Sequence, residues 1–335
     1  MTNYQRDDYL MLFASCIPVK GVKRSILYDL QRNNFEYIPN DLFNFIEKTK
    51  SLPLNLIIQS YGTKNKNHIF EYVDFIIQNE FGFIEKKEKK DCFIPLELDW
   101  ETPSVISNAI LDKIGVERYC SIPNKLNILG CEHLYIIEED LSLIEIEVIL
   151  RSFSLSRVNS IRLRLIRRKD TPIVGYEALL KKYKRLDVIF LKVRESEKLD
   201  NSNDRIKLFI DENSKLPLYN YFSINVEMFT EAIAFNPYFN RKMYINSKGD
   251  VKNALETQEI FGKIDDLSAT DLIDIVNTSK FQEYWKTSKN SIKICSDCEY
   301  RYMCLDNRLP RLNREEEWEY SSDCTYNPYK TFWDA

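Results

Sequence analysis

The chain is organised around the stretch Cys295-Ser-Asp-Cys298-Glu-Tyr-Arg-Tyr-Met-Cys304, which Cys324 follows. These four cysteines have the spacing C-x2-C-x5-C-x19-C and make up half of the eight cysteines in the 335-residue chain. Four cysteines gathered by loops form a metal site more often than disulfides when no secretion signal is present. The stretch therefore predicts a four-cysteine metal site at Cys295, Cys298, Cys304 and Cys324.

The spacing also indicates which metal centre to expect. Zinc sites built from cysteines usually repeat a tight C-x2-C pair, and here only the first pair has that spacing. Three clustered thiolates and a distant fourth suit a [4Fe-4S] cluster, whose irons spread the ligands apart. We expect one such cluster, with zinc as the alternative and reduced cysteines packed as small apolar side chains as a third reading. The third is disfavoured because the stretch holds the charged residues Asp297, Glu299, Arg301 and Asp306.

The composition disfavours several classes of function. The net charge is −4, with lysine and arginine spread along the chain, which argues against nucleic-acid binding. Neither glycine-rich phosphate-binding motif, GxGxxG or GxxxxGK[ST], occurs among the eight glycines. No apolar run is long enough to span a membrane, and the first residues are too polar for a signal peptide, so we expect a cytoplasmic protein.

The first 98 residues show strands followed by helices. We expect one buried strand at 9–17 and a hairpin turn at 31–34. The first helix begins at Pro39-Asn40-Asp41, where Asn40 or Asp41 can cap it. A small sheet followed by helices predicts a winged-helix-like domain that ends at the charged run 85–91. Its other expected elements are strands at 24–30, 35–38 and 81–84 and helices at 54–60 and 67–79.

The middle of the chain alternates between strand and helix patterns, which predicts an α/β domain with a parallel sheet, either open or part of a barrel. The expected strands are 134–137, 160–166, 188–193 and 205–210, and the expected helices are 105–114, 142–153 and 175–183. Active sites on such sheets lie at the carboxyl ends of strands. Charged residues follow three of these strands, and they indicate either a site or solvated loops: Glu138, Glu139, Asp140, Arg167, Arg168, Arg194 and Glu195.

The last segment begins at residue 223. It is expected to contain a hairpin with strands at 242–246 and 251–254, joined by a turn that contains Gly249. Phe281 and Trp285 are expected on one face of a helix just before the cysteine stretch.

This last segment resembles a SPASM domain, the C-terminal extension of radical SAM peptide maturases. The resemblance rests on Phe235-Asn-Pro-Tyr-Phe-Asn-Arg-Lys-Met-Tyr-Ile-Asn-Ser-Lys-Gly249, on Phe281-Gln-Glu-Tyr-Trp285 and on the cysteine stretch. Cys298 to Arg308, together with Phe13-Ala-Ser-Cys16-Ile-Pro18, are similar to the grasp-with-spasm subfamily in particular. The resemblance covers most of the chain and is strongest at its two ends.

The resemblance has implications for cofactors. A full SPASM domain holds two auxiliary [4Fe-4S] clusters, and the outer one would be retained here on the four predicted cysteines. Family cysteines of the other cluster fall at Arg308 and Ala254, so that cluster would be lost. Radical SAM chemistry needs C-x3-C-x2-C, and none of the remaining cysteines has that spacing. We therefore expect a degenerate, partial radical-SAM-like barrel and no S-adenosylmethionine.

The N-terminal unit of such maturases is a RiPP recognition element, a domain for ribosomally made, modified peptides. It binds a precursor's leader peptide by strand addition. Mapped onto this chain, the resemblance implies a groove between 35–38 and the helix at 69–77. Each candidate groove residue is equally well explained as core. The candidates are Phe35, Tyr37, Ile38, Phe70, Val73 and Ile77.

The expected function follows from these implications. We expect an accessory peptide maturase of graspetide-type RiPP biosynthesis that binds the leader peptide and assists an ATP-grasp ligase. The alternative is a peptide-modifying enzyme that uses the iron–sulfur cluster, and a homodimer is left open. A winged-helix DNA binder is disfavoured because 67–79 holds no lysine or arginine. The expected domains are a recognition element at 1–98, a radical-SAM-like α/β domain at 99–222 and a SPASM domain at 223–335.

Overall fold

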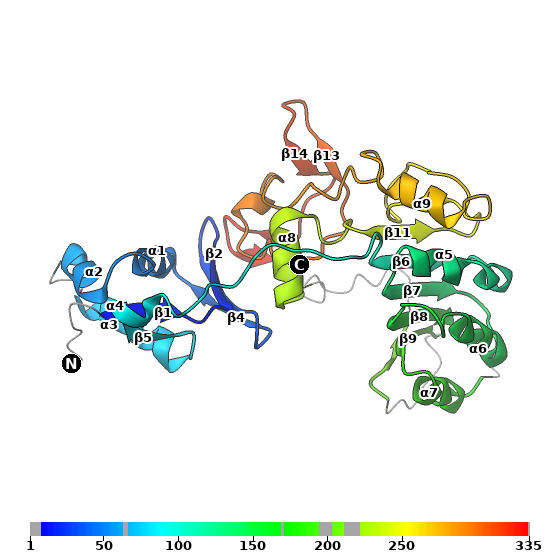
Figure 1. Cartoon of the computed structure of the whole chain (residues 1–335), viewed down its shortest axis with the longest axis horizontal. Helices are drawn as coiled ribbons and strands as arrows, with labels where there is room; N and C mark the ends of the chain where they lie inside the picture. Colours follow the sequence, from blue (N-terminus) through cyan, green and yellow to red (C-terminus); the bar gives the residue numbers. More distant parts are fainter. Residues whose placement is uncertain (1–7, 63–65, 169–170, 194–202, 211–221, 334–335) are drawn as a thin grey trace. The chain divides into compact units, whose positions relative to one another are not determined.

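A computed structural model of the protein describes residues 8–62, 66–168, 171–193, 203–210 and 222–333. It is a mixed α/β protein with one largely parallel sheet and several small antiparallel sheets. The chain divides into two compact units, whose elements Figure 1 colours along the sequence. The first unit contains Met1–Trp100, Leu218–Pro237 and Thr287–Ala335, and the second contains Glu101–Pro217 and Tyr238–Lys286.

This division differs from three consecutive domains, because the predicted last domain is shared between the two units. Its first part, Tyr238–Lys286, joins the second unit, since β11 (Lys242–Ile245) pairs in parallel with β6 (Asn108–Asp112). Its second part, Thr287–Ala335, joins the first unit, where the cysteine stretch packs against the N-terminal strands. The two ends of the chain therefore build one unit together.

Four strands open the first unit: β1 (Asp8–Leu12), β2 (Cys16–Lys20), β3 (Ser25–Asp29) and β4 (Asn34–Ile38). β2, β3 and β4 form an antiparallel sheet in that order, whereas β1 pairs with β5 (Gly82–Lys86) in a separate sheet. The single strand predicted at 9–17 is therefore wrong. The backbone N–H of Cys16 donates to the carbonyl of Phe13 at 2.8 Å, and this turn separates β1 from β2.

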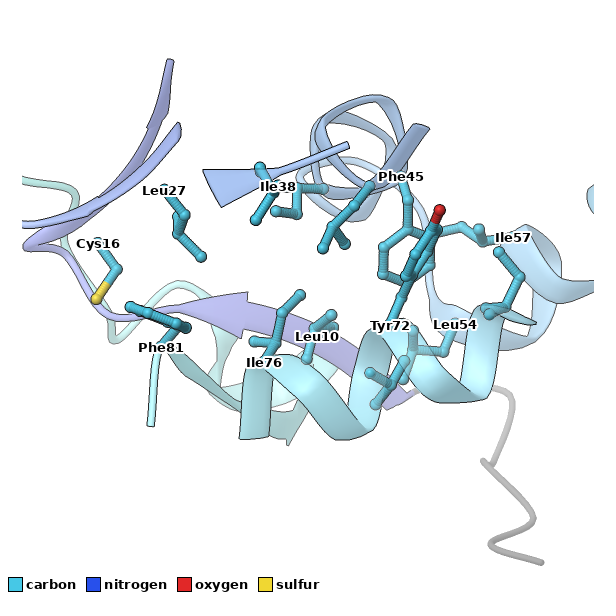
Figure 2. Close-up of a cluster of buried hydrophobic side chains, with 14 residues drawn as sticks. Leu10, Cys16, Leu27, Ile38, Phe45, Leu54, Ile57, Tyr72, Ile76 and Phe81 are labelled. Atoms are coloured by element: carbon cyan, nitrogen blue, oxygen red, sulfur yellow. The ribbon is translucent and has the colours of Figure 1, made fainter. Parts of the chain in front are cut away.

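Three helices follow β4: α1 (Asn40–Thr49), α2 (Leu54–Tyr61) and α3 (Lys66–Gln78). The predicted capping of α1 by Asn40 or Asp41 is wrong, because Pro39 is the N-cap and makes no side-chain hydrogen bond. The amide of Asn40 instead donates to the carbonyls of Gly21 and Val22. The helices pack their apolar faces into a core with β1 and the β2–β4 sheet, and in Figure 2 Ile38 and Phe45 face Leu10 and Ile76.

The β2–β4 sheet is covered on both faces, which explains why all five residues of β3 are buried. Leu27 faces the core that contains the helices. Ile26 and Tyr28 alternate with it along the strand and pack on the other face against Met303 and Tyr326. The sheet therefore lies between the helices and the cysteine stretch.

The remaining elements of the first unit are short. The charged run predicted at 85–91 ends β5 and forms α4 (Lys87–Lys90), which buries no residue. The C-terminal part is held by turns and two small hairpins. Its elements are α8 (Val226–Ala234), the 3-10 helix η4 (Cys295–Asp297), the hairpin β13 (Pro310–Leu312) with β14 (Trp318–Tyr320), and the hairpin β15 (Tyr326–Asn327) with β16 (Phe332–Trp333).

The second unit is built on a seven-stranded sheet in the order β10-β9-β8-β7-β6-β11-β12. All pairs from β10 to β11 are parallel, and β11 and β12 form the predicted antiparallel hairpin. The other strands are β7 (His133–Glu138), β8 (Ser160–Ile166), β9 (Leu186–Lys192), β10 (Ile206–Phe209) and β12 (Val251–Lys252). The helices are η2 (Val116–Cys120), α5 (Ile122–Ile128), α6 (Leu143–Ser152), α7 (Ile173–Lys182) and α9 (Ala269–Val276).

Two predictions in this unit are wrong. The segment 105–114 contains strand β6 and not a helix, because Ala109 and Leu111 are buried while Ile110 is half-buried, the two-residue period of a strand. The segment is a strand because β6 pairs in parallel with β7 on one side and with β11 on the other. The segment from Phe281 to Trp285 consists of turns and not of a helix.

The two faces of the sheet differ in chemistry. Successive strands β6 to β10 lie in sequence order, so right-handed crossovers put the connecting helices on one face, where Figure 1 shows α5, α6 and α7. The residues facing these helices are buried and aliphatic, such as Ile136, Leu163 and Ile189. Most residues on the opposite face are half-buried or exposed, and many are polar or aromatic. None of the described helices is long and apolar enough to cross a membrane.

Candidate metal centre

The cysteine stretch folds as consecutive tight turns. After η4, the backbone N–H of Cys298 donates to the carbonyl of Cys295 at 3.0 Å. The N–H of Met303 donates to the carbonyl of Tyr300 at 3.0 Å, and Cys304 forms an antiparallel bridge with Phe222. The first two cysteines therefore share one turn, and the third follows directly after the next.

The four thiols are half-buried and influence one another. Burial raises the pKa of Cys295 to about 11 and that of Cys304 to about 12, and Cys324 adds to both shifts. Burial, followed by the neighbouring Glu299 and the other cysteines, raises the pKa of Cys298 well above its ordinary value. The Sγ of Cys324 accepts the backbone N–H of Tyr326 at 3.4 Å. Metal binding must displace the thiol protons, so it is favoured by rising pH.

The two expected metal centres, a [4Fe-4S] cluster and zinc, require different arrangements of these four sulfurs. In the described residues no three His, Cys, Asp or Glu side chains are arranged to hold one metal ion. Zinc needs all four sulfurs about 2.3 Å from one atom, whereas a [4Fe-4S] cluster binds each thiolate to a different iron. Cys295, Cys298, Cys304 and Cys324 would hold the cluster, which would supply electron transfer or a covalent crosslink between loops.

A buried lysine lies next to the cysteines, and its charge suits a negatively charged metal centre of either kind. Lys289 is 2% exposed, and its Nζ has no hydrogen-bond partner among the described residues. Burial by itself favours the neutral amine, but Tyr320, Cys304, Asp306 and Cys295 outweigh it and raise the pKa of Lys289. An unpaired buried ammonium is strongly unfavourable unless a negative charge accompanies it. Four thiolates around iron or zinc carry such a charge.

The two positions that lack the family cysteines have other roles. Arg308 forms a bidentate ion pair with the buried Asp306, with Nε 3.0 Å from both carboxylate oxygens. Its Nη1 also donates to the carbonyl of Ser322 at 2.6 Å. Ala254 is fully buried in the second unit. Of the four other cysteines, Cys16 and Cys131 are buried and the remaining two, Cys92 and Cys120, are exposed.

A buried ion pair links the cysteine stretch to the β2–β4 sheet. Glu299, between two of the cysteines in sequence, is fully buried, and its Oε1 lies 2.8 Å from Nε of Arg24. The hydroxyl of Tyr326 donates to the same oxygen at 2.5 Å, and the hydroxyl of Tyr28 on β3 donates to the backbone carbonyl of Glu299 at 3.2 Å. The metal loop and the sheet are therefore tied together by charge.

An aromatic cluster extends this link to β4. The guanidinium of Arg24 lies 3.7 Å from the ring centroid of Tyr37 and donates to the hydroxyl of Tyr300 at 2.9 Å. The hydroxyls of Tyr37 and Tyr300 are 2.5 Å apart, and the rings of Phe35 and Tyr300 meet edge to face. Burial raises the pKa of Tyr300, so the phenol stays neutral. One face of β4 thus rests on the metal loop.

The predicted groove residues do not form one surface. Ile38 and Val73 are fully buried in the helical core, so they are closed to a peptide. Phe35 and Tyr37 contact Tyr300 of the cysteine stretch. On α3, Ile77 is exposed and Phe70 is half-buried beneath the Lys66 ammonium.

The charged strand ends of the second unit are paired. Glu138 is buried and accepts the hydroxyl of Tyr119 at 3.1 Å, and burial raises its pKa. Glu139 lies 2.5 Å from Lys113, and Asp140 lies 3.0 Å from Arg168. Arg167 donates to the carbonyl of Thr171. These pairs are typical of structural and solvated contacts, while Arg194 and Glu195 lie outside the described residues.

The sequence did not indicate the roles of three residues of this site. These are the buried Lys289, and Arg24 and Glu299, which form an ion pair. The position of Glu299 inside a metal loop and its charge were the only signals available for that residue. Nothing in the spacing indicates that Arg24 would meet it, because the two are 275 residues apart. Lys289 lies in a polar segment that looks exposed from sequence alone.

Replacing Lys289 with methionine is expected to destabilise the metal-loaded form more than the metal-free form. In the metal-free form the cost of burying the ammonium and its attraction to the surrounding groups largely cancel, so Lys289→Met changes the free energy of unfolding by no more than about 1 kcal/mol. In the metal-loaded form the same change removes the counter-charge of the thiolates and lowers it by about 3 kcal/mol. Urea unfolding of both forms, with the metal content measured, checks this. The exposed Lys330→Met is the control, and equal effects on both forms would contradict it.

No protein-family model matches the sequence, and no curated protein matches it. Among solved structures the chain is similar to SuiB of Streptococcus suis, with a TM-score of 0.30 and 12% identity over 90% of this chain and 94% of that one. SuiB bound to S-adenosylmethionine gives 0.30 and 11% over the same shares. SuiB bound to its precursor peptide SuiA gives 0.28 and 10%, over 91% of this chain and 94% of that one. Similarity at this level does not by itself assign a fold or an activity.

Proposed function

We propose that this protein binds the leader peptide of a ribosomally made precursor and presents the precursor to an ATP-grasp ligase. The peptide adds as a further strand to the outer edge of β4. A four-cysteine centre, a [4Fe-4S] cluster with zinc as the alternative, holds the loop that supports β4. In this proposal the protein is an accessory to the ligase and carries out no radical chemistry.

The observation that carries the proposal is the position of β4. It is the terminal strand of its sheet, and no described strand pairs with its outer edge. Two of its five residues are aromatic, and each face is packed in part, one by the helices through Ile38 and the other by the cysteine stretch through Phe35. A supported strand with one free edge is suited to β-augmentation, and it is an aggregation risk when left uncovered.

In this proposal the metal centre supports the peptide site through the contacts around Arg24. A centre with four cysteine ligands has no open coordination position, so it acts on the peptide through structure. It fixes the turn that carries Glu299 and Tyr300, and these residues hold Arg24 and Tyr37 beside β4. The same argument disfavours the alternative of a peptide-modifying enzyme that uses the cluster.

Hydrogen exchange of the full-length protein tests the peptide site. With a candidate leader peptide added, the outward-facing amides among Asn34–Ile38 are expected to exchange at least about tenfold more slowly, because an added strand accepts their N–H groups. The paired strands β13 and β14, which lie elsewhere in the unit, serve as the internal control. The proposal would be contradicted if the peptide slowed exchange in other segments and left the exchange of the β4 amides unchanged.

A further inference from the structure

The second unit carries a distinct surface on the face of its sheet that is turned away from the helices. Register places Tyr135 beside Arg162, Arg164 beside Phe190, and Phe190 beside Lys207 on neighbouring strands. The guanidinium of Arg164 lies 4.8 Å from the ring centroid of Phe209. We call this surface the basic–aromatic face, and it consists of Tyr135, Arg162, Arg164, Phe190, Lys207 and Phe209.

This face is unusual for a parallel sheet. Parallel strands normally bury both faces and are aliphatic on both sides. Here Arg162 and Lys207 are exposed, and Arg164, Phe190 and Phe209 are half-buried. The aliphatic residues alternate with them along each strand and point to the helices. The difference between the two faces therefore follows from the strand sequences.

The charge of the face is positive. The six residues include three cations and no acid, and Lys192 lies beside Phe209 in register. Two carboxylates lie near its borders, and both are hydrogen-bonded. Asp187 accepts the hydroxyl of Ser160, and Asp112 accepts the hydroxyl of Tyr244 at 2.6 Å. In the part of the chain that the structure describes, neither of these carboxylates is paired with Arg162, Arg164 or Lys207.

We propose that the basic–aromatic face binds an extended, acidic peptide segment. Arg162 and Arg164 are two residues apart on one strand, so their side chains repeat about every 6.6 Å, the repeat of alternate side chains in an extended peptide. Carboxylates at that repeat pair with the cations, and the side chains between them pack on Phe190 and Phe209. β10 ends the sheet, and no described strand pairs with its outer edge, so a peptide can also run alongside it.

The inference deepens the proposed function, since it names the chemistry of a second segment of the same precursor. The leader peptide would occupy β4 in the first unit, and an acidic segment of the precursor would occupy the second unit. A single-stranded nucleic acid also presents regular negative charges and stacking rings. The peptide is favoured because a peptide strand can form main-chain hydrogen bonds with the outer edge of β10, and a nucleic acid cannot.

A binding titration with the full-length protein tests the inference. The probe is a fluorescein-labelled peptide of about twelve residues in which glutamate alternates with threonine, at a salt concentration near 0.15 M. The variant Arg162→Gln/Arg164→Gln/Lys207→Gln is expected to weaken binding by about tenfold or more, because three charge-assisted contacts are lost. The control is Arg157→Gln/Lys181→Gln/Lys184→Gln, which changes the charge equally at exposed cations outside the face. This control is expected to bind like the original protein.

Each outcome decides the question. Loss of binding in the face variant alone, together with weak binding of a matched glutamine peptide, supports the inference. Equal loss in both variants would show nonspecific attraction and overturn it, as would no loss in either. Equal or tighter binding of a labelled single-stranded DNA of similar length would assign the face to nucleic acid instead. Hydrogen exchange at β4 is measured in the same variants, so a failure here is separate from a failure of the leader site.

Discussion

Replacing Cys298 with serine is expected to remove the metal from the protein and to lower the unfolding temperature of the first unit by roughly 10 °C. Ligation of a structural metal is worth about 10–16 kcal/mol in small domains, so the loss of even part of it is large. A change of 1 kcal/mol shifts the unfolding temperature by about 2–4 °C in a domain of this size. Metal content and thermal unfolding of the purified variant check the result.

The effect is expected to spread beyond the metal loop. Cys298 precedes Glu299, which pairs with Arg24 at 2.8 Å, and Tyr28 of β3 donates to the carbonyl of Glu299. Faster hydrogen exchange is therefore expected in β2–β4 as well as in the loop. The sequence alone predicted separate domains for the two ends of the chain, whereas in the structure they belong to one unit. Cys92→Ser, at an exposed cysteine outside the stretch, is the control and is expected to keep its metal and its stability. A Cys298→Ser variant with full metal content would contradict the four-cysteine site.

Replacing Arg24 with methionine is expected to lower the free energy of unfolding by about 3 kcal/mol, because Glu299 would keep a buried charge without its partner. The side chain of Glu299 is 0% exposed, whereas that of Arg24 is 27% exposed. The change also removes the cation above the ring of Tyr37 and one donor to Tyr300. Urea unfolding of the metal-loaded protein measures the loss.

A matched control is available in the same unit. Arg311 pairs with Glu319 at 2.9 Å, but the side chain of Arg311 is 60% exposed and that of Glu319 is 30% exposed. Arg311→Met is therefore expected to change the free energy of unfolding by no more than about 1 kcal/mol. The double variant Arg24→Met/Glu299→Leu is expected to recover much of the loss, since no charge is then left buried. Similar losses for Arg24→Met and Arg311→Met would contradict the prediction, because the buried pair would then contribute no more than an exposed one.

Sequence patterns predicted the local elements best where periodicity or turn residues were clear. The strands 160–166 and 35–38, the hairpin around Gly249 and the three N-terminal helices all appear, because each is decided by residues within a few positions. The turn at Phe13 inside an apolar run and the strand β6 were missed. Pairing with distant strands decided both, since β1 pairs with β5 and β6 pairs with β11.

The candidate site shows the same limit. Cysteine spacing predicts which residues share a metal loop, because ligands must come from tight turns. Cysteine spacing gives no information on which part of the chain packs against the metal loop. In the structure, the face of β4 that carries Phe35 and Tyr37 packs against it. Side chains alternate along a strand, so Phe35 and Tyr37 lie on one face of β4 and Ile38 lies on the other. The predicted groove included all three residues and therefore combined two different faces.

The most direct test of the account is the affinity of the precursor peptide for the same protein with and without its metal. Calorimetry is performed on anaerobically purified, metal-loaded protein and on protein treated with a chelator, and iron and zinc are measured in both. The account predicts about four irons per chain in the loaded form and a peptide affinity that falls about tenfold or more when they are removed, because Tyr300 and Glu299 then no longer hold β4. Equal affinity in both forms would contradict it, since the metal loop would then have no part in supporting the peptide site.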